Sequence, residues 1–151
     1  MIEVVSEPSC LIDPQLLDGV SRRIQAVARE VAANEHVIFG DVTVLVVSTE
    51  RISTLHQQFF NDPSPTDVIT FPGLTHPEGE RLDGDIAICV DIAREQAIAE
   101  GHALDDEIVF LALHGLLHLC GWDDGSDAER RVMLARQTEI MQSAGRTSNA
   151  S

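Results

Sequence analysis

The stretch Ile108-Val-Phe-Leu-Ala-Leu-His-Gly-Leu-Leu-His-Leu-Cys120 is the most apolar run of the chain, and it contains two histidines, His114 and His118. Residues four apart on a helix lie on the same face, one turn from each other. The run therefore predicts a buried helix that brings two imidazoles within reach of one cation. It is shorter than the roughly 20 residues that a membrane-spanning helix requires, which favours a buried helix.

A third ligand is expected from beyond this helix. Gly121 ends the helical pattern, and Asp123 and Asp124 follow soon after it. Catalytic zinc sites use three protein ligands and leave one position open. The spacing indicates a His-x3-His-x5-Asp site that ends at Asp124, but Asp123 and Asp127 lie near enough to compete. All three aspartates would also suit a solvated turn before a helix.

Neighbouring residues narrow the kind of site. A single histidine on an apolar helix would be read as a hydrogen-bonded core residue, but two unpaired imidazoles would each cost about 1–3 kcal/mol, which favours a metal. Cys120 is expected to be a buried thiol, because it points to another side of the helix. Gly115 stands where His-Glu-x-x-His peptidases carry their glutamate base. It allows either close packing of a neighbouring element or room for a substrate.

Composition sets limits on the domain and its partners. The 151 residues suffice for one domain, placed at 1–144, with a disordered tail at 145–151. The net charge is −15 and the chain has no lysine, so RNA binding would need a local basic cleft or the metal. We expect no DNA and no membrane as partners. Three scattered cysteines and the lack of a leader pattern predict a cytoplasmic location.

The pattern of apolar residues predicts a mixed α/β domain of about four strands and five helices. Asp13 is expected to cap the first helix, with Pro14 at its first position, and that helix should end near Asn34. A polar loop is predicted at 73–83. The other predicted helices are 49–59, 91–100, 104–120 and 126–144, and the predicted strands are 2–6, 41–48, 66–71 and 84–90.

Three segments together resemble the YbeY family, bacterial rRNA maturation factors regarded as metal-dependent endoribonucleases. His114-Gly-Leu-Leu-His-Leu-Cys-Gly-Trp-Asp-Asp124 is similar to the family signature His-Gly-x-Leu-His-Leu-x-Gly-[Tyr/Trp]-Asp-His. Pro65-Thr-Asp-Val-Ile-Thr-Phe-Pro72 is similar to the family's Pro-Thr-Asp-Val-Leu-Ser-Phe-Pro, and Leu82-Asp-Gly-Asp-Ile-Ala-Ile-Cys89 to its Leu-Gly-Asp-Ile-x-Ile strand. Order and spacing agree from about Val42 to Met141.

The resemblance implies a mixed sheet packed by helices and one zinc ion held by three histidines. His114 and His118 match the first two, whereas the third falls on Asp124. A carboxylate is a competent zinc ligand, but it should acidify a bound water less and admit other divalent metals more readily. At Phe60 the family carries an arginine that would pair with phosphate. Phe60 is expected to pack on the core, with base stacking or partial replacement by His56 as the alternatives.

The implied function is metal-assisted, single-strand-specific hydrolysis of RNA during rRNA maturation, with ribosomal RNA or a ribosomal subunit as partner. Asp85 and Asp67 are weak candidates for the general base and better suited to a positioning or structural role. One alternative is a non-catalytic ribosome-assembly factor, favoured by Phe60, Asp124 and the acidic charge. Another is a metal-dependent hydrolase of a different ester or peptide, disfavoured by Gly115. Basic residues around the cleft would favour the nuclease, and the candidates are Arg22, Arg23, Arg51, Arg94, Arg130 and Arg131.

Overall fold

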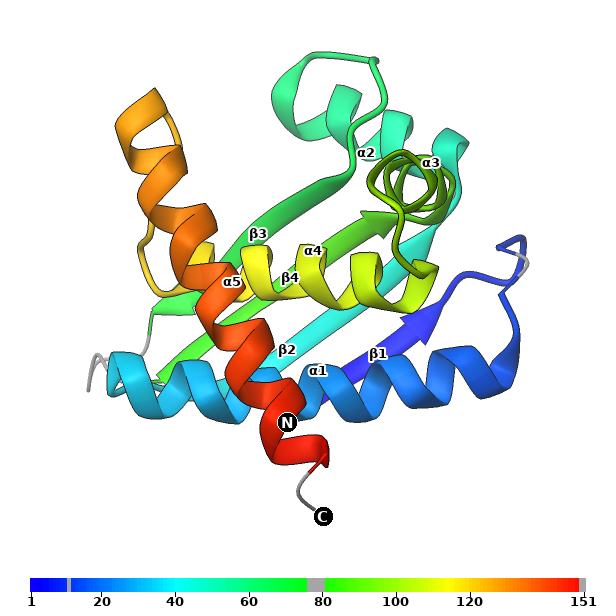
Figure 1. Ribbon diagram of the computed structural model, residues 1–151. Helices are drawn as coiled ribbons and strands as arrows, with labels where there is room; N and C mark the ends of the chain where they lie inside the picture. Colours follow the sequence, from blue (N-terminus) through cyan, green and yellow to red (C-terminus); the bar gives the residue numbers. More distant parts are fainter. Residues whose placement is uncertain (11, 76–80, 150–151) are drawn as a thin grey trace.

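The computed structural model describes residues 1–10, 12–75 and 81–149 (Figure 1). Within them, four strands and five helices form an α/β domain, which confirms the predicted fold class. The strands are β1 (Ile2–Ser6), β2 (Ile38–Val47), β3 (Val68–Thr75) and β4 (Arg81–Cys89). The helices are α1 (Pro14–Glu35), α2 (Thr49–Phe60), α3 (Val90–Glu100), α4 (Leu104–Leu119) and α5 (Asp127–Asn149).

The four strands form one mixed sheet in the order β1-β2-β4-β3. Strands β1, β2 and β4 run parallel, and β3 runs antiparallel to β4 at the edge. One row of the register, Val4–Val44–Ile86–Thr70, crosses the whole sheet. Side chains directly opposite each other on neighbouring strands point to the same face, so this row lies on one face of the sheet.

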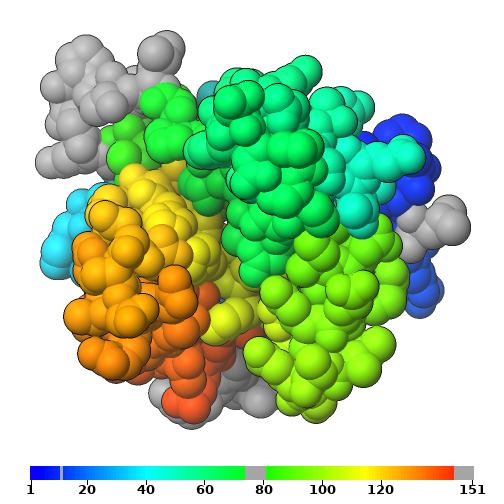
Figure 2. Space-filling view, turned by 90° about the horizontal axis from the view of Figure 1, so that it is seen from above, coloured from blue at the N-terminus to red at the C-terminus, as the bar shows by residue number. Residues whose placement is uncertain are grey.

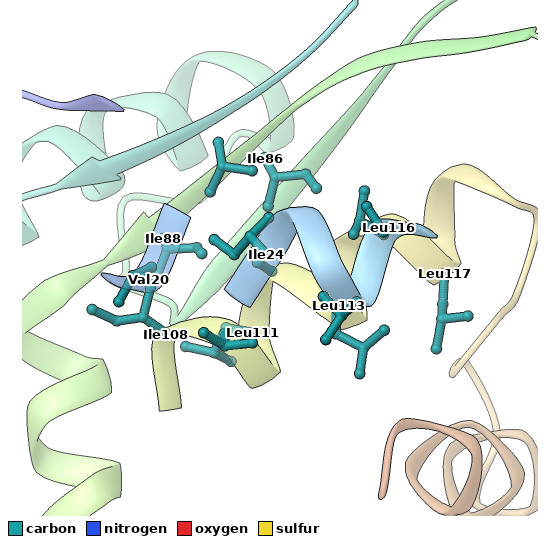
Figure 3. Close-up of a cluster of buried hydrophobic side chains, with 14 of the residues drawn as sticks. Val20, Ile24, Ile86, Ile88, Ile108, Leu111, Leu113, Leu116 and Leu117 are labelled. Atoms are coloured by element: carbon teal, nitrogen blue, oxygen red, sulfur yellow. The ribbon is translucent and has the colours of Figure 1, made fainter. Parts of the chain in front are cut away.

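Helices cover both faces of the sheet unequally. The larger core lies between the sheet and α1, α4 and α5, and Figure 3 shows Val20 and Ile24 of α1 packed with Ile86 and Ile88 of β4 and with leucines of α4. The smaller core on the opposite face includes Ile52 of α2. Helix α4 is therefore the central element of the larger layer, as its apolar run predicts (Figure 1).

Two glycines let α4 lie directly against β4. A Cβ atom at Gly115 would stand 2.8 Å from the side chain of Ile86, and one at Gly84 would stand 2.6 Å from that of Leu119. Both distances are below those that carbon atoms tolerate, so close packing is the reason for Gly115. The alternative, room for a substrate beside Gly115, is not what the structure shows.

Local signals at the helix starts are confirmed. The side chain of Asp13 accepts a hydrogen bond from the Gln15 amide at 2.9 Å, and Ser48 caps α2 through the Arg51 amide at 3.3 Å. The Ser126 hydroxyl likewise accepts from the Glu129 amide at 3.1 Å at the start of α5. None of the helices among the described residues is both long and apolar enough to cross a bilayer.

Several element boundaries differ from the sequence prediction, with β2 beginning at Ile38 rather than at 41. Part of the loop predicted at 73–83 is strand, because β3 continues to Thr75 and β4 begins at Arg81; residues 76–80 lie outside the described part. Pro72 does not interrupt β3, since an edge strand can tolerate a residue that donates no hydrogen bond. Helix α5, expected to end near Ala144, continues to Asn149, and residues 150–151 of the predicted tail lie outside the described part.

Glu7, just after β1, fastens the start of α2 to the sheet. Its carboxylate accepts hydrogen bonds from the Ser48 amide at 2.8 Å, the Ser9 hydroxyl at 3.0 Å and the Arg51 guanidinium at 3.2 Å. Burial raises the pKa of Glu7, but these hydrogen bonds together outweigh it and lower the pKa from 4.5 to about 2. The position of α2, which carries His56 and Phe60, therefore depends on an ionised Glu7.

Replacement of Gly115 by alanine should destabilise the fold. Alanine favours a helix interior by about 1 kcal/mol over glycine, but overpacking against Ile86 costs about 1–3 kcal/mol. Gly19→Ala is the matched control, because Gly19 also lies inside a helix and nothing stands within 4 Å of its Cβ position. We expect urea unfolding to show a loss for Gly115→Ala and a gain of about 0.5–1 kcal/mol for Gly19→Ala. Equal effects would contradict this account of α4 packing.

The contribution of Glu7 to stability should depend on pH. Because its folded pKa lies below its unfolded value, the contribution is complete above pH 4.5 and is lost as the pH falls towards 2. Glu7→Gln should lower the free energy of unfolding by about 1.5–3 kcal/mol at pH 7, the range for hydrogen bonds to a charged group. The gap between variant and wild type, measured by urea unfolding, should narrow as the pH falls below 4.5 and close towards pH 2. A gap that stays constant down to pH 3 would disprove the linkage.

Candidate metal centre

Helix α4 carries His114 and His118 on the face that looks towards the β3 edge of the sheet. Both side chains are half-buried, and their rings meet edge to face with centroids 4.5 Å apart. The two Nε2 atoms approach to 3.0 Å. The pair predicted from the i, i+4 spacing is therefore formed, with the same nitrogen of each ring directed at a common point.

Hydrogen bonds at the opposite nitrogens define the protonation of both rings. His114 Nδ1 lies 2.8 Å from Oε1 of Gln137, and His118 Nδ1 lies 2.9 Å from the carbonyl oxygen of Trp122. Gln137 donates its amide to the Phe110 carbonyl at 3.4 Å, which directs its Oε1 at His114. Since both partners accept, each neutral imidazole carries its proton on Nδ1. Two Nε2 lone pairs then face each other, an arrangement that a shared cation stabilises.

Asp124 completes the group from the turn that follows α4. Gly121 adopts a left-handed conformation, φ 99°, that turns the chain back. Asp124 Oδ2 lies 3.2 Å from Nε2 of His114, and its Oδ1 lies 3.6 Å from Nε2 of His118. A tetrahedral ion with bonds of about 2.0–2.1 Å separates its ligand atoms by about 3.3–3.4 Å. The three side chains thus lie close to the arrangement that one metal ion requires.

The neighbouring candidates have other roles. Asp123 accepts hydrogen bonds from the amides of Asp124 and Gly125 and so shapes the turn. Asp127 begins α5. Cys120 is half-buried rather than buried, and it takes no part in the group; desolvation still raises the pKa of its thiol to about 12, with the Glu35 carboxylate adding to it. Of the three aspartates that the sequence offered as the third ligand, Asp124 is the one whose carboxylate lies beside both histidines.

A cleft of about 490 Å³ opens in front of the histidines. Figure 2 looks onto this face, with α2 and the loop after it on one side of the hollow and the α4–α5 turn on the other. Thr70 of the edge strand β3 and Asp67 of the loop before β3 line the cleft. The lining also includes two residues of α2, His56 and Phe60.

Comparison with known proteins identifies the family. The family model described as "Endoribonuclease YbeY" matches residues 6–145. The chain belongs to the YbeY family. The match extends beyond the Val42–Met141 segment in which the sequence motifs agree.

Individual relatives agree with this assignment. An endoribonuclease YbeY of Micrococcus luteus is 38% identical over 76% of this chain and 77% of the relative. That of Geobacillus kaustophilus is 39% identical over 82% of this chain and 86% of the relative. The solution structure of TM1509 from Thermotoga maritima has a TM-score of 0.62 and 27% identity, and the alignment covers 99% of this chain and 93% of that one.

The two aspartates considered for the YbeY-like chemistry line different hollows of the surface. Asp67 lines the cleft, where its carboxylate accepts from the Val68 amide at 2.8 Å and from the Gln96 side chain at 3.3 Å. Asp85 is exposed on the other face of β4, in a hollow with Phe59 and Phe71. The structure therefore brings Asp67 but not Asp85 to the cleft.

Phe60 differs from its expected position, and the arginines lie away from the cleft. Phe60 does not pack into the core, because 55% of its surface is exposed. None of the arginines among the described residues lines the cleft. Four of the six that were singled out pair with carboxylates elsewhere: Arg22 with Asp18, Arg23 with Asp105 and Asp106, Arg51 with Glu7, and Arg94 with Asp91. The other two, Arg130 and Arg131, are exposed near the start of α5.

A second histidine–carboxylate group lies at the other end of α4. His102 Nε2 is 2.7 Å from the buried carboxylate of Glu107, and Glu100 stands at 4.0 Å from the other ring nitrogen. Burial raises the pKa of Glu107, although the hydrogen bond from His102 opposes it. This contact ties the turn between α3 and α4 to the first turn of α4.

Sequence reasoning missed Gln137, which is only 1% exposed. One signal was present: Gln137 occupies a core position in the helical series Met133–Gln137–Ile140–Ala144, whose other members are buried and apolar. A polar residue in such a stripe indicates a buried hydrogen-bond partner. That partner is His114, on a different helix.

Loss of the Gln137 acceptor should weaken metal binding. Gln137→Leu leaves Nδ1 of His114 without an acceptor, and changes of this kind typically lower metal affinity 10- to 100-fold. Gln142→Leu, an exposed glutamine on the same helix, is the matched control. Zinc affinity measured by competition with a chromophoric chelator should fall for the first variant alone, with folding checked by circular dichroism. Equal affinities would show that Gln137 serves packing only.

Proposed function

We propose that this chain is a metal-dependent endoribonuclease of the cytoplasm that hydrolyses single-stranded RNA during rRNA maturation, with ribosomal RNA as its partner. The observation that carries the proposal is the convergence of His114 Nε2, His118 Nε2 and the Asp124 carboxylate within 3.0–3.6 Å at the base of an open cleft. Its relatives are named endoribonucleases, which supports RNA as the substrate.

His114, His118 and Asp124 would hold the ion, and zinc suits two imidazoles and one carboxylate. When bound, such an ion lowers the pKa of a water and offsets the charge of a phosphoryl oxygen. Gln137 and the Trp122 carbonyl keep both imidazoles in the required tautomer and orientation. Because the mouth of the cleft is open, a phosphodiester of a flexible strand has access to the three ligands.

The role of Asp67 is more consistent with positioning than with proton transfer. Its carboxylate oxygens accept from Val68 and Gln96, so both are already engaged with neighbouring segments. The contact with Gln96 joins the cleft-lining loop to α3. We therefore assign Asp67 to holding the start of β3 beside the metal ligands, and we assign no residue as general base.

One observation favours a second candidate, a ribosome-assembly factor that keeps the metal for stability. No arginine lines the cleft among the described residues, and the chain carries a net charge of −15. A nuclease commonly uses cations to hold its phosphates. Under this alternative the chain binds metal and ribosomal RNA but leaves the RNA intact.

Substitution of Asp124 tests the proposal. Asp124→Ala should lower zinc occupancy, because two imidazoles alone make an incomplete site, and should abolish cleavage of a labelled single-stranded RNA. Asp124→His should retain zinc, and Asp127→Ala, which removes a nearby exposed carboxylate, should behave as wild type. Occupancy is measured by elemental analysis and cleavage by gel electrophoresis, with each variant expressed and purified in the same way.

The contrary outcomes are distinct. Unchanged occupancy in Asp124→Ala would show that Asp124 is not a ligand. Cleavage that persists after complete removal of the metal would exclude a metal-dependent mechanism. A wild-type chain that holds zinc and binds RNA without cutting it would favour the assembly factor.

A further inference from the structure

Two large aromatic side chains are exposed side by side at the end of α2. Phe59 is 63% exposed and Phe60 55%, in a chain with five phenylalanines, one tryptophan and no tyrosine. They face different places: Phe60 lines the cleft with the metal ligands, whereas Phe59 lies in the hollow on the other face of the sheet. An exposed aromatic ring in the same cleft as the candidate metal ligands is informative, since burial is the usual state of such rings.

The ring of Phe60 is held in place by its neighbours. The His56 ring lies one turn earlier, with centroids 5.5 Å apart, and the Phe71 ring of β3 lies 6.4 Å from Phe60. His56 Nδ1 is 2.8 Å from the carbonyl oxygen of Ser64, so the loop after α2 is tied back to the helix. Asn61 ends α2 in a left-handed conformation and starts this loop. Phe60 and His56 thus present an ordered aromatic surface to the cleft.

The charge of the cleft limits how it could hold a nucleic acid. Apart from histidines, the described lining residues include no basic side chain, and they include the carboxylates of Asp67 and Asp124. Affinity from neutralised phosphates therefore has little source outside the metal centre. Stacking of a base on an aromatic ring needs no positive charge, and one such contact is worth about tenfold in affinity, equivalent to about 1.4 kcal/mol.

We propose that Phe60, with His56 beside it, is a stacking platform for one unpaired base of the strand whose phosphate reaches the metal centre. The inference rests on the proposed function and specifies how the same cleft selects its substrate. A base within a duplex is already covered on both faces by its neighbours, so only an unpaired base offers its face to Phe60. Preference for single strands then follows from the ring, with no cationic clamp on the phosphates.

The test uses the full chain carrying zinc and a labelled 12-nucleotide single-stranded RNA, with fluorescence anisotropy as the binding measurement. Phe60→Ala should weaken binding about tenfold. It should leave the dependence of log affinity on log salt unchanged, because it removes no charge. Phe59→Ala, the matched control, removes an equally exposed ring outside the cleft and should bind as wild type. Anisotropy is read before gel electrophoresis detects any cleavage of the strand, and circular dichroism confirms folding.

Two further arms identify stacking specifically. Phe60→Arg should restore affinity at low salt by contacting a phosphate and should steepen the salt dependence by about 0.7. In wild type, one 2-aminopurine position along the strand should lose fluorescence on binding, and Phe60→Ala should remove that quenching. An abasic nucleotide at the same position should weaken wild-type binding as much as Phe60→Ala does, with no additional loss when both are combined.

The outcomes separate this inference from the proposed function. Suppose that wild type cleaves RNA but Phe60→Ala binds the strand as tightly as wild type, or Phe59→Ala loses as much affinity as Phe60→Ala. Either result overturns the stacking platform and leaves the nuclease proposal unaffected. Binding that depends on Phe60 without any cleavage supports the platform and overturns the nuclease. A wild-type chain with no measurable affinity for the single strand overturns both.

Discussion

The close crossing of α4 over β4 is the contact on which the rest of the structure depends. It is made possible by two positions without side chains, Gly115 against Ile86 and Gly84 against Leu119. Because α4 lies against the sheet, the apolar residues of the helix complete the larger core. Its remaining face then points past the edge strand β3 and carries the two histidines to the cleft. The packing of the core and the position of the metal centre thus have the same origin.

The candidate metal centre is preorganised by residues that lie outside α4. Gln137 lies on α5, and Asp124 lies in the turn that follows α4. Each Nδ1 proton is committed to an acceptor, so both Nε2 lone pairs must face the same point. Without a cation, lone pairs and carboxylate repel one another. Metal binding is therefore expected to stabilise α5 and the turn as well as the site.

The order and type of the elements could be predicted because local signals and the global fold agree. The apolar run of α4 and the Asp13 cap each require only a few neighbouring residues to be recognised. Where the prediction was incomplete, the missing information was spatial. The face on which Asp85 lies depends on which side of β4 the helix α4 covers, and the partner of Gln137 depends on how α5 crosses α4. The exposure of Phe60 depends on where α2 ends relative to the β3 edge.

RNA is a polyanion, yet the described lining of the cleft holds few positive charges. An ion held by two neutral imidazoles and one carboxylate keeps a net positive charge, and no arginine of the described cleft lining competes with it for a phosphate. In such a cleft the phosphate that binds best is the one at the metal, because other phosphates gain little. Under the proposed stacking, contacts to bases would then hold the strand, and Phe60 is the exposed aromatic side chain of the lining that can make them. Under the two proposals, Asp124 and Phe60, the two departures from the family pattern, would act on different parts of the substrate, the reacting phosphate and the neighbouring base.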